Sequence, residues 1–327
     1  MPNSLYYIGI DLGGTLIKLA AIDVSSDPPV FGPVLRAATP AGDAEGIVEA
    51  MMTAGREVLD RCRAAGGEVA GVGIGAPGPL NREQGVVVNS PNLPELSGMP
   101  IRGRIAKGLG LPALLENDAN AAAWGEHVFG AARGVASMVL LTLGTGVGGG
   151  IVADGQLVHG AHDFAGEIGH MIIHPGGRAC TCGQAGCLEQ YASAGNIARA
   201  ATAAIREGRK SSLGALLDER GGLSSADVHQ ACRGGDALAA EIWDQAAYAL
   251  AVSCVSLQRV LDCQMIVLAG GLTRAGADLL EPIRRHYAAL NWRMTDTPVE
   301  ITLAALGDDT GVYGAAAVAW KTMEQNR

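Results

Sequence analysis

Short apolar runs separated by glycine-rich turns dominate the start of the chain. Residues 6–10 and 16–22 are each long enough for a buried strand, and the segment DLGGT (residues 11–15) lies between them. Two apolar runs joined by a short glycine-containing segment predict a β-hairpin. We therefore expect the chain to begin with a hairpin whose tip is rich in glycine.

A helix, a strand and a long loop are predicted next. Residues 43–65 have apolar side chains near helical spacing, and Gly66-Gly67 predicts the end of that helix. Residues 69–75 predict a strand. The Gly-, Pro- and Asn-rich residues 76–100 predict a loop, and its length favours a functional role.

The opening pattern occurs a second time in the middle of the chain. Residues 138–143 form an apolar run that is followed by the Gly/Thr turn GTGVGGG, a second apolar run and a hairpin turn at Asp154-Gly155. The sequence thus has the same strand–tip–strand pattern near residues 13 and 146. We expect two similar halves that face each other.

The last part of the chain alternates between helices and strands. Residues 190–260 are helical in pattern, with interruptions at Gly221-Gly222 and Gly234-Gly235. A strand over 264–269, a helix, a strand over 299–304 and an alanine-rich helix complete the chain. Strands that alternate with helices predict the α/β class.

Composition excludes fibrous, disordered and nucleic-acid-binding classes. The 327 residues are enough for about two domains, 48% are hydrophobic and only 17% are charged. The 47 glycines show no collagen-like period, so they mark tight turns or close backbone contacts. The formal net charge of −9 opposes binding to a phosphate backbone, and no cluster of Lys and Arg is visible in the sequence.

The sequence also favours a cytoplasmic protein. The uncharged residues 134–153 are long enough to cross a membrane, but their six glycines favour a strand–turn–strand. The N-terminus lacks the basic and apolar regions of a signal peptide. An odd number of cysteines, seven, argues for a reducing compartment.

Both glycine-rich tips are candidate phosphate sites. Gly13 and Gly14 let backbone N–H groups approach a phosphate, Thr15 adds a hydroxyl, and Asp11 could hold Mg²⁺. An ordinary hairpin turn is the alternative for this motif.

The second tip carries Gly144, Thr145 and Gly146. It contains the pattern GxGxxG, but a hairpin follows where a dinucleotide-binding motif needs a helix. The chain also has no Gly-Lys dipeptide, which excludes a Walker A loop. Two such turns could hold one triphosphate between them.

One segment has the ligand types and spacing of a zinc site. His170, Cys180, Cys182 and Cys187 supply one imidazole and three thiols, and glycines between them allow a tight loop. A disulfide is the alternative, but Cys180 and Cys182 are too close in sequence for relaxed geometry. We therefore expect a structural zinc ion.

Acidic residues around this segment are candidates for a polar pocket. Residues 113–116 predict a strand that leads into an alanine-rich helix, and Asn117 or Asp118 could cap this helix. Asp118 could instead act as a general base beside an orienting Asn117. Glu167 and Glu189 flank the predicted zinc loop, where each could be a surface charge or accept hydrogen bonds from substrate hydroxyls.

The motifs in this order resemble those of the ROK family of sugar kinases, with bacterial glucokinases nearest in pattern. IGIDLGGT, ENDANAA, LGTGVGGG, GEIGH, CTCGQAGCLE and VLAGG carry the resemblance, which runs from Ile8 to the last helix. It implies an α/β, actin-like ATPase (ribonuclease H-like) fold with an active-site cleft between two α/β domains. Residues 1–116 plus 311–327 would form the small domain and residues 117–310 the large one, and the last helix would pack on the first domain.

The resemblance also implies roles for individual residues. Asp118 would be the catalytic base, and His170 would contact the sugar as well as zinc. The other sugar contacts would be Asn117, Glu167, Glu189, Gly78 and Asn92. ATP would be bound by Asp11, Gly13, Gly14, Thr15, Gly144, Thr145 and Gly146, with Gly270 and Gly271 near the adenosine. Lys18 could add a phosphate contact.

The implied reaction is transfer of the ATP γ-phosphoryl group to the primary hydroxyl of a hexose, with Mg²⁺ and with glucose as the expected substrate. N-acetylmannosamine, N-acetylglucosamine, fructose and allose are the alternatives within the family. The family also contains transcriptional repressors, but only ten residues precede Asp11 and the chain is acidic, which disfavours this class. A non-catalytic sugar sensor is disfavoured because Asp118 and the phosphate glycines are present. The resemblance further implies a homo-oligomer, a dimer or tetramer.

Overall fold

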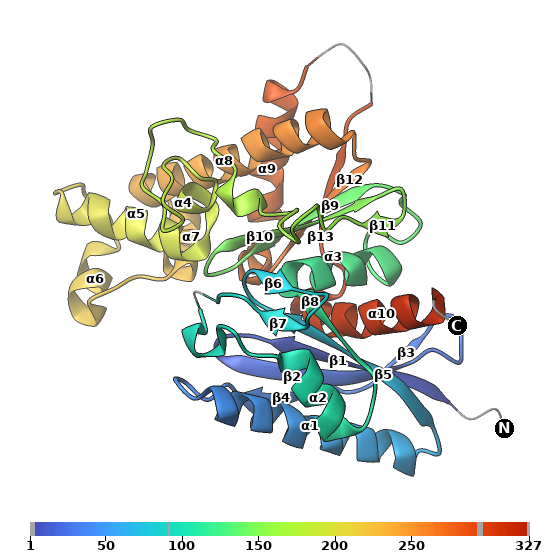
Figure 1. The fold of residues 1–327 in the computed structure, drawn as a ribbon. Coiled ribbons are helices and arrows are strands. Elements are labelled where there is room, and N and C mark those ends of the chain that lie inside the picture. The colour runs from blue at the N-terminus through green and yellow to red at the C-terminus, as the bar shows by residue number, and fades with distance from the viewer. Residues whose placement is uncertain (1–3, 91, 293–296, 326–327) are drawn as a thin grey trace.

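Two mixed β-sheets with a pair of helices between them form the centre of the molecule (Figure 1). The computed structural model describes residues 4–90, 92–292 and 297–325. The first sheet has the order β3-β2-β1-β5-β8, with β4 also pairing to β2. Its strands are β1 (Leu5–Leu12), β2 (Leu16–Asp23), β3 (Val30–Phe31), β4 (Leu35–Ala38), β5 (Glu68–Ala76) and β8 (Ala113–Asn117).

The second sheet repeats this arrangement. Its order is β11-β10-β9-β12-β13, formed by β9 (Met138–Leu143), β10 (Val147–Ala153), β11 (Gln156–Leu157), β12 (Met265–Ala269) and β13 (Glu300–Leu303). In each sheet an antiparallel hairpin, β1–β2 or β9–β10, is followed by two parallel strands. The prediction of two similar halves is therefore confirmed, and residues 134–153 form a hairpin. None of the helices in the described ranges is long and apolar enough to cross a membrane.

The two helices between the sheets are α3 (Asp118–Val128) and α10 (Thr310–Gln325). Helix α10 packs on α3, β1 and β5, while α3 also packs on β10 and β9. Glycine makes this contact possible, because a Cβ on Gly73 would lie 1.8 Å from the carbonyl oxygen of Ala315. A Cβ on Gly314 would lie 1.9 Å from the carbonyl oxygen of Ala121, so the two helices also touch each other through bare backbone.

The other helices cover the outer faces of the sheets. Helices α1 (Ala44–Ala64) and α2 (Ile101–Leu109) contribute to the apolar core of the first sheet. Most of the core of the second sheet comes from the region between β11 and β12 and from the helix after β12. These helices are α4 (Glu189–Ala192), α5 (Ala194–Arg206), α6 (Gly214–Arg220), α7 (Ser225–Arg233), α8 (Ala237–Leu261) and α9 (Ala277–Leu290).

Most predicted elements are present, and the differences lie in two segments. The predicted loop over residues 76–100 contains a small hairpin, β6 (Leu80–Asn81) and β7 (Val86–Val87). That prediction was wrong in part, because two-residue strands leave almost no alternation to detect. Helix α2 and strands β3 and β4 were not predicted. Helix α2 does have apolar residues four apart, at Ile101, Ile105 and Leu109, but two glycines interrupt the pattern.

We expect Gly73→Ala to destabilise the fold severely. Its Cβ would overlap the backbone of α10, which cannot move like a flexible side chain. Overpacking of this kind costs about 3 kcal/mol or more in free energy of unfolding. Chemical denaturation measures the effect. Gly103→Ala is the matched control, because nothing lies within 4 Å of its Cβ position in α2, and it should stabilise by about 0.5–1 kcal/mol. A Gly73→Ala protein as stable as the wild type would contradict this packing.

Candidate active site

A cleft of about 510 Å³ lies where several elements end near one another. The C-terminal end of β1, the N-termini of α3 and α10 and the turn after β12 all contribute to its wall. The lining residues are Asp11, Leu16, Lys18, Arg36, Asp118, Ala119, Ala122, Thr142, Ala269, Gly270, Gly271, Arg274, Gly307, Asp308, Thr310 and Gly311. The structure thus brings Asp11, Asp118 and Gly270-Gly271 together, as the sequence predicts.

Asp118 is the first residue of α3 and faces this cleft. The preceding residue, Asn117, caps the helix, and its side-chain oxygen accepts hydrogen bonds from the N–H groups of Ala119 and Asn120. The pKa of Asp118 is raised to about 7. Burial is the largest cause, and the negative charge of Asp11 is the next. This carboxyl group can therefore accept and release a proton near neutral pH.

Asp11 lies in β1, directly opposite Lys18 of β2. Burial raises the pKa of Asp11, the charge of Lys18 lowers it and the charge of Asp309 raises it. A carboxylate close to a second acid, in a cleft that is partly shielded from water, suits a divalent cation that binds oxygen ligands. Asp11 thus fits the predicted Mg²⁺ site.

The first glycine-rich turn is held from outside by Thr39. The hydroxyl of Thr39 donates to the carbonyl oxygen of Gly13 at 2.7 Å, and its backbone N–H donates to the carbonyl oxygen of Thr15 at 3.0 Å. Within the turn, the N–H of Gly13 donates to the carbonyl oxygen of Leu16. Asn92 lies beside this turn, because its carbonyl oxygen is 3.8 Å from the Cβ position of Gly14. Asn92 therefore lies near the predicted phosphate site.

Glu189 holds the second glycine-rich turn. Its Oε2 accepts a hydrogen bond from the N–H of Val147 at 3.0 Å and fills the space where a Gly146 side chain would be. The turn is also bound to the start of α5, since the N–H of Ala194 donates to the carbonyl oxygen of Gly144. The sequence predicts a sugar contact for Glu189, and the structure adds this link to the turn.

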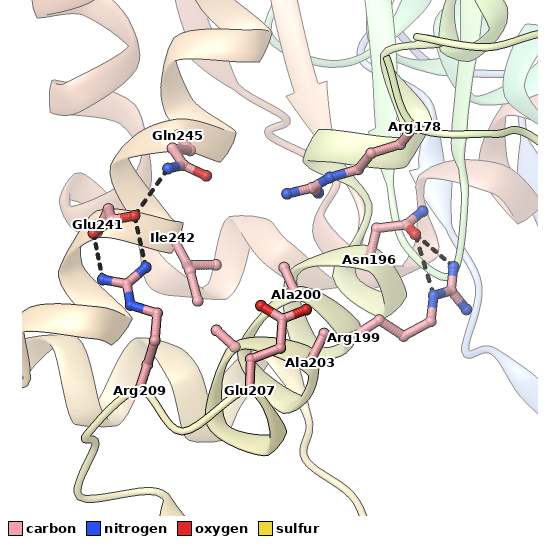
Figure 2. Close-up of a pocket in the computed structure, with 11 residues that line it drawn as sticks. Arg178, Asn196, Arg199, Ala200, Ala203, Glu207, Arg209, Glu241, Ile242 and Gln245 are labelled. Carbon is pink, nitrogen blue, oxygen red and sulfur yellow. Dashed lines mark hydrogen bonds and ion pairs between the residues drawn. The ribbon is translucent and has the colours of Figure 1, made fainter.

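Helix α4, which carries Glu189, is anchored by two side chains from outside the cleft. The Nη1 of Arg178 donates to the carbonyl oxygen of Gln190 at 2.9 Å, and the Nδ2 of Asn196 donates to that of Glu189 at 2.7 Å. Both side chains line a second cavity, of about 410 Å³, together with Arg199 and with Arg209, which pairs with Glu241 (Figure 2). These three arginines are far enough apart in sequence that no basic cluster is visible there.

The predicted zinc ligands lie together. One ligand atom from each of His170, Cys180, Cys182 and Cys187 lies within 4.8 Å of all the others. The Sγ atoms of Cys182 and Cys187 are 3.7 Å apart, as are the Sγ of Cys180 and the Nδ1 of His170. Ligands about 2.3 Å from a tetrahedral zinc ion are separated by about 3.8 Å, so the cluster fits this ion. All seven cysteines lie in the described part of the chain, and none forms a disulfide.

A neighbouring amide supports this cluster. The Nε2 of Gln190 donates to the Sγ of Cys180 at 3.4 Å. Burial raises the pKa of the Cys180 thiol, but hydrogen bonds from Cys182 and Gln190 outweigh burial and lower this pKa to about 7. A thiol that ionises easily is suited to metal binding.

The remaining predicted residues lie near Asp118, whose pKa is raised in part by the charge of Glu167. The Nδ2 of Asn117 points to the carbonyl oxygen of Gly78 at 3.5 Å, which links α3 to the 76–100 segment. Gly78 has φ +90°, and a Cβ there would lie 2.3 Å from the carbonyl oxygen of Asn89. Glu167 directly precedes the short 3-10 helix Ile168–His170, so it is three residues from the zinc ligand His170.

One wall of the cleft was not predicted from the sequence. The segment from Gly307 to Gly311 comprises a short 3-10 helix, Gly307–Asp309, and the start of α10, and three basic side chains contact it. Lys18 donates to the carbonyl oxygen of Asp308, Arg274 pairs with the Asp308 carboxylate at 2.7 Å, and Arg36 pairs with Asp309 at 2.7 Å. The string GDDTG was the available signal, because it has the same Gly/Asp/Thr character as the two predicted turns.

Comparison with known proteins agrees with this architecture. Residues 7–322 match the family model described as the ROK family. The chain belongs to the ROK family. It is 37% identical to the glucokinase of Halalkalibacterium halodurans, with 98% of this chain and 96% of that protein covered.

Two solved structures of the family are informative. The ROK family glucokinase from Streptomyces griseus, in complex with glucose and AMPPNP, is 33% identical with a TM-score of 0.80, and 97% of this chain and 99% of that one are covered. A ROK family transcriptional regulator is 25% identical with a TM-score of 0.83, and 96% of this chain covers 78% of that one. The predicted α/β, actin-like ATPase fold is confirmed.

Proposed function

We propose that this ROK protein is a hexose kinase that transfers the γ-phosphoryl group of ATP to the primary hydroxyl of glucose. The observation that carries the proposal is the partly buried Asp118 carboxyl, which lies in the cleft with Asp11 and has a pKa raised to about 7. Relatives with the name glucokinase, at 36–37% identity over nearly the whole chain, support the choice of glucose.

Asp118 would accept the proton of the attacking sugar hydroxyl. General bases work best when their pKa lies near the operating pH, and the Asp118 pKa of about 7 meets this condition. Asn117, Glu167, His170 and Glu189 would orient the other hydroxyls. Removal of bulk water from the cleft would favour transfer to the sugar over hydrolysis of ATP.

The backbone of the two glycine-rich turns would bind the triphosphate. Phosphoryl transfer depends mainly on positioning and on neutralisation of charge, and Mg²⁺ bound near Asp11 would supply part of that neutralisation. Lys18, Arg36 and Arg274 add positive charge to the opposite wall of the cleft. The adenosine would lie near Gly270 and Gly271.

The zinc ion would be structural. Four protein ligands complete a tetrahedron and leave no position for a reacting water. Bound zinc would fix Cys187, two residues before Glu189, and thereby the segment that holds the second glycine-rich turn. We also propose the two-domain division at residues 116/117 and 310/311, a cytoplasmic location and a homo-oligomeric state.

A coupled assay with ATP and a panel of sugars tests the proposed function. We expect turnover with glucose, and lower values of kcat/KM with N-acetylmannosamine, N-acetylglucosamine, fructose and allose. If one of these sugars gives a higher kcat/KM than glucose, that sugar is the preferred substrate instead. Binding of sugar without any turnover would instead support a sugar-sensing regulator.

Asp118→Asn should remove phosphoryl transfer and leave sugar binding intact. Asparagine keeps the shape of the side chain and can still accept the hydrogen bond from the N–H of Ala119, but it cannot take up a proton. Loss of a general base lowers kcat by about 10²–10⁴-fold. Steady-state kinetics and calorimetric titration with glucose measure the two effects.

Asp227→Asn is the matched control for this variant, because Asp227 is a carboxylate in the first turn of α7, outside the cleft. It should keep the wild-type kcat. An Asp118→Asn enzyme with more than a tenth of the wild-type kcat would exclude Asp118 as the base.

Metal analysis of the purified protein should find about one zinc ion per chain. Cys182→Ser should lose that zinc and lower the melting temperature, since the ligand set is then incomplete. Cys232→Ser is the control, because Cys232 is a free cysteine outside the cluster, and it should keep the metal. A zinc-free wild-type protein with full thermal stability would refute the site.

A further inference from the structure

A buried carboxylate next to the catalytic region has no role in the scheme above. Glu116 lies at the end of β8, is only 1% exposed and directly precedes Asn117 and Asp118. A buried carboxylate is costly unless charged partners and hydrogen bonds compensate it. The groups that contact Glu116 therefore indicate which structural role offsets this cost.

The two oxygens of Glu116 face different partners. Oε1 accepts hydrogen bonds from the first turn of α3, at 2.9 Å from the N–H of Asn117 and 3.1 Å from the Nδ2 of Asn120. Oε2 lies 3.0 Å from the Nε of Arg82, in an ion pair, and 2.9 Å from the Nε2 of His159. One side chain thus joins α3 to two segments that are distant in sequence.

These two segments are the small β6–β7 hairpin and the loop that follows the second sheet at β11. Arg82 lies in the turn between β6 and β7, four residues after Gly78, while His159 follows β11 of the second sheet. Arg82 also contacts the loop after β11 directly, because its Nη1 lies 3.4 Å from the Oδ1 of Asp163. The backbone also ties this segment into a compact loop, since the N–H of Ala165 donates to the carbonyl oxygen of His159.

The loop that begins at His159 leads directly to the predicted sugar-binding residue Glu167. Gly166 packs against Asn120, since a Cβ on Gly166 would lie 3.5 Å from the Asn120 Oδ1. That Oδ1 is buried and has no hydrogen-bond partner in the described structure, whereas the Nδ2 of the same amide is held by Glu116. Glu116 therefore lies next to three segments on the proposed sugar side of the site. These are the segment with Gly78, the segment with Glu167 and helix α3.

We propose that Glu116 is a positioning residue for the sugar, which acts by holding Arg82 and His159 against the first turn of α3. In this arrangement the segments with Gly78 and Glu167 keep a fixed distance from Asp118. The inference rests on the proposed hexose kinase function. It concerns the sugar and not the nucleotide, because none of Glu116, Arg82 and His159 lines the cleft that contains Asp11 and Gly270.

Glu116→Gln tests the proposal with little change of shape. The glutamine oxygen can still accept from Asn117 and Asn120, but its NH₂ group would face the donors of Arg82 and His159. We expect the KM and the Kd for glucose to rise about 10-fold or more, with kcat within about threefold and the KM for ATP unchanged, because small misplacements of binding groups have effects of this size. His159→Ala, at a partly exposed position, should raise the KM for glucose in the same way.

Glu126→Gln is the matched control. Glu126 is also fully buried and lies near the C-terminal end of α3, where it accepts from the N–H groups of Ala131, Ala305 and Leu306 and from the Thr310 hydroxyl. We expect this variant to lower the melting temperature and to leave the KM for glucose unchanged. A merely structural role for Glu116 would give the same pattern as Glu126.

The double variant Glu116→Gln/His159→Ala completes a thermodynamic cycle. If the two residues act as one unit, the double variant should bind glucose with a Kd no higher than that of the single variant with the higher Kd. Folded Glu116→Gln protein with a KM for glucose within twofold of the wild type would overturn the proposal. If this variant fails to fold, a wild-type KM in His159→Ala overturns it. A wild-type enzyme that phosphorylates no sugar refutes the proposed function, whereas active wild type with unaffected variants refutes this inference alone.

Discussion

The close contact of α3 and α10 between the two sheets is the constraint on which the cleft depends. Gly73 and Gly314 let these helices touch the first sheet and each other through bare backbone. Both helices begin at the cleft, α3 at Asp118 and α10 at Thr310. Helix N-termini carry unpaired N–H groups and a partial positive charge, which favours anions. The packing of the centre of the molecule thus gives the cleft an electrostatic character that suits phosphate.

The same constraint explains the unusual state of Asp118. A carboxylate at a helix N-terminus is normally stabilised in its charged form. Here burial and the nearby Asp11 outweigh that effect and raise the pKa of Asp118 to about 7. Lys18 lies opposite Asp11 in the β1–β2 hairpin and its charge lowers the Asp11 pKa, while its ammonium group also donates to the carbonyl oxygen of Asp308 and pairs with Asp309 at 3.8 Å. The charge of Lys18 therefore offsets only part of the effect of burial on Asp11, whose pKa stays raised, and a divalent cation bound there would add positive charge.

The sequence predicted much of the fold, and several predicted site residues line one cleft, because these features depend on local signals. Glycine-rich tips between apolar runs predicted both hairpins, and the spacing of His170 and three cysteines predicted that these side chains lie together. Other features depend on contacts between distant residues. No local pattern indicates that Arg82 and His159 meet at Glu116, or that Arg178 and Asn196 anchor α4. The wall from Gly307 to Gly311 was missed for a different reason: its motif was visible, but its place beside Asp11 follows only from the return of α10 to the first sheet.

The repeat of the two sheets has a consequence for how such a protein can change over evolution. The two turns that would hold the phosphates lie at equivalent places in the two halves. They would bind phosphate through backbone N–H groups, a role that few side chains could take over. The segments that would bind the sugar, residues 76–100 and 158–189, lie outside the repeated hairpins and parallel strands. Selectivity for the sugar can therefore diverge by substitution in these segments while the nucleotide-binding frame stays the same.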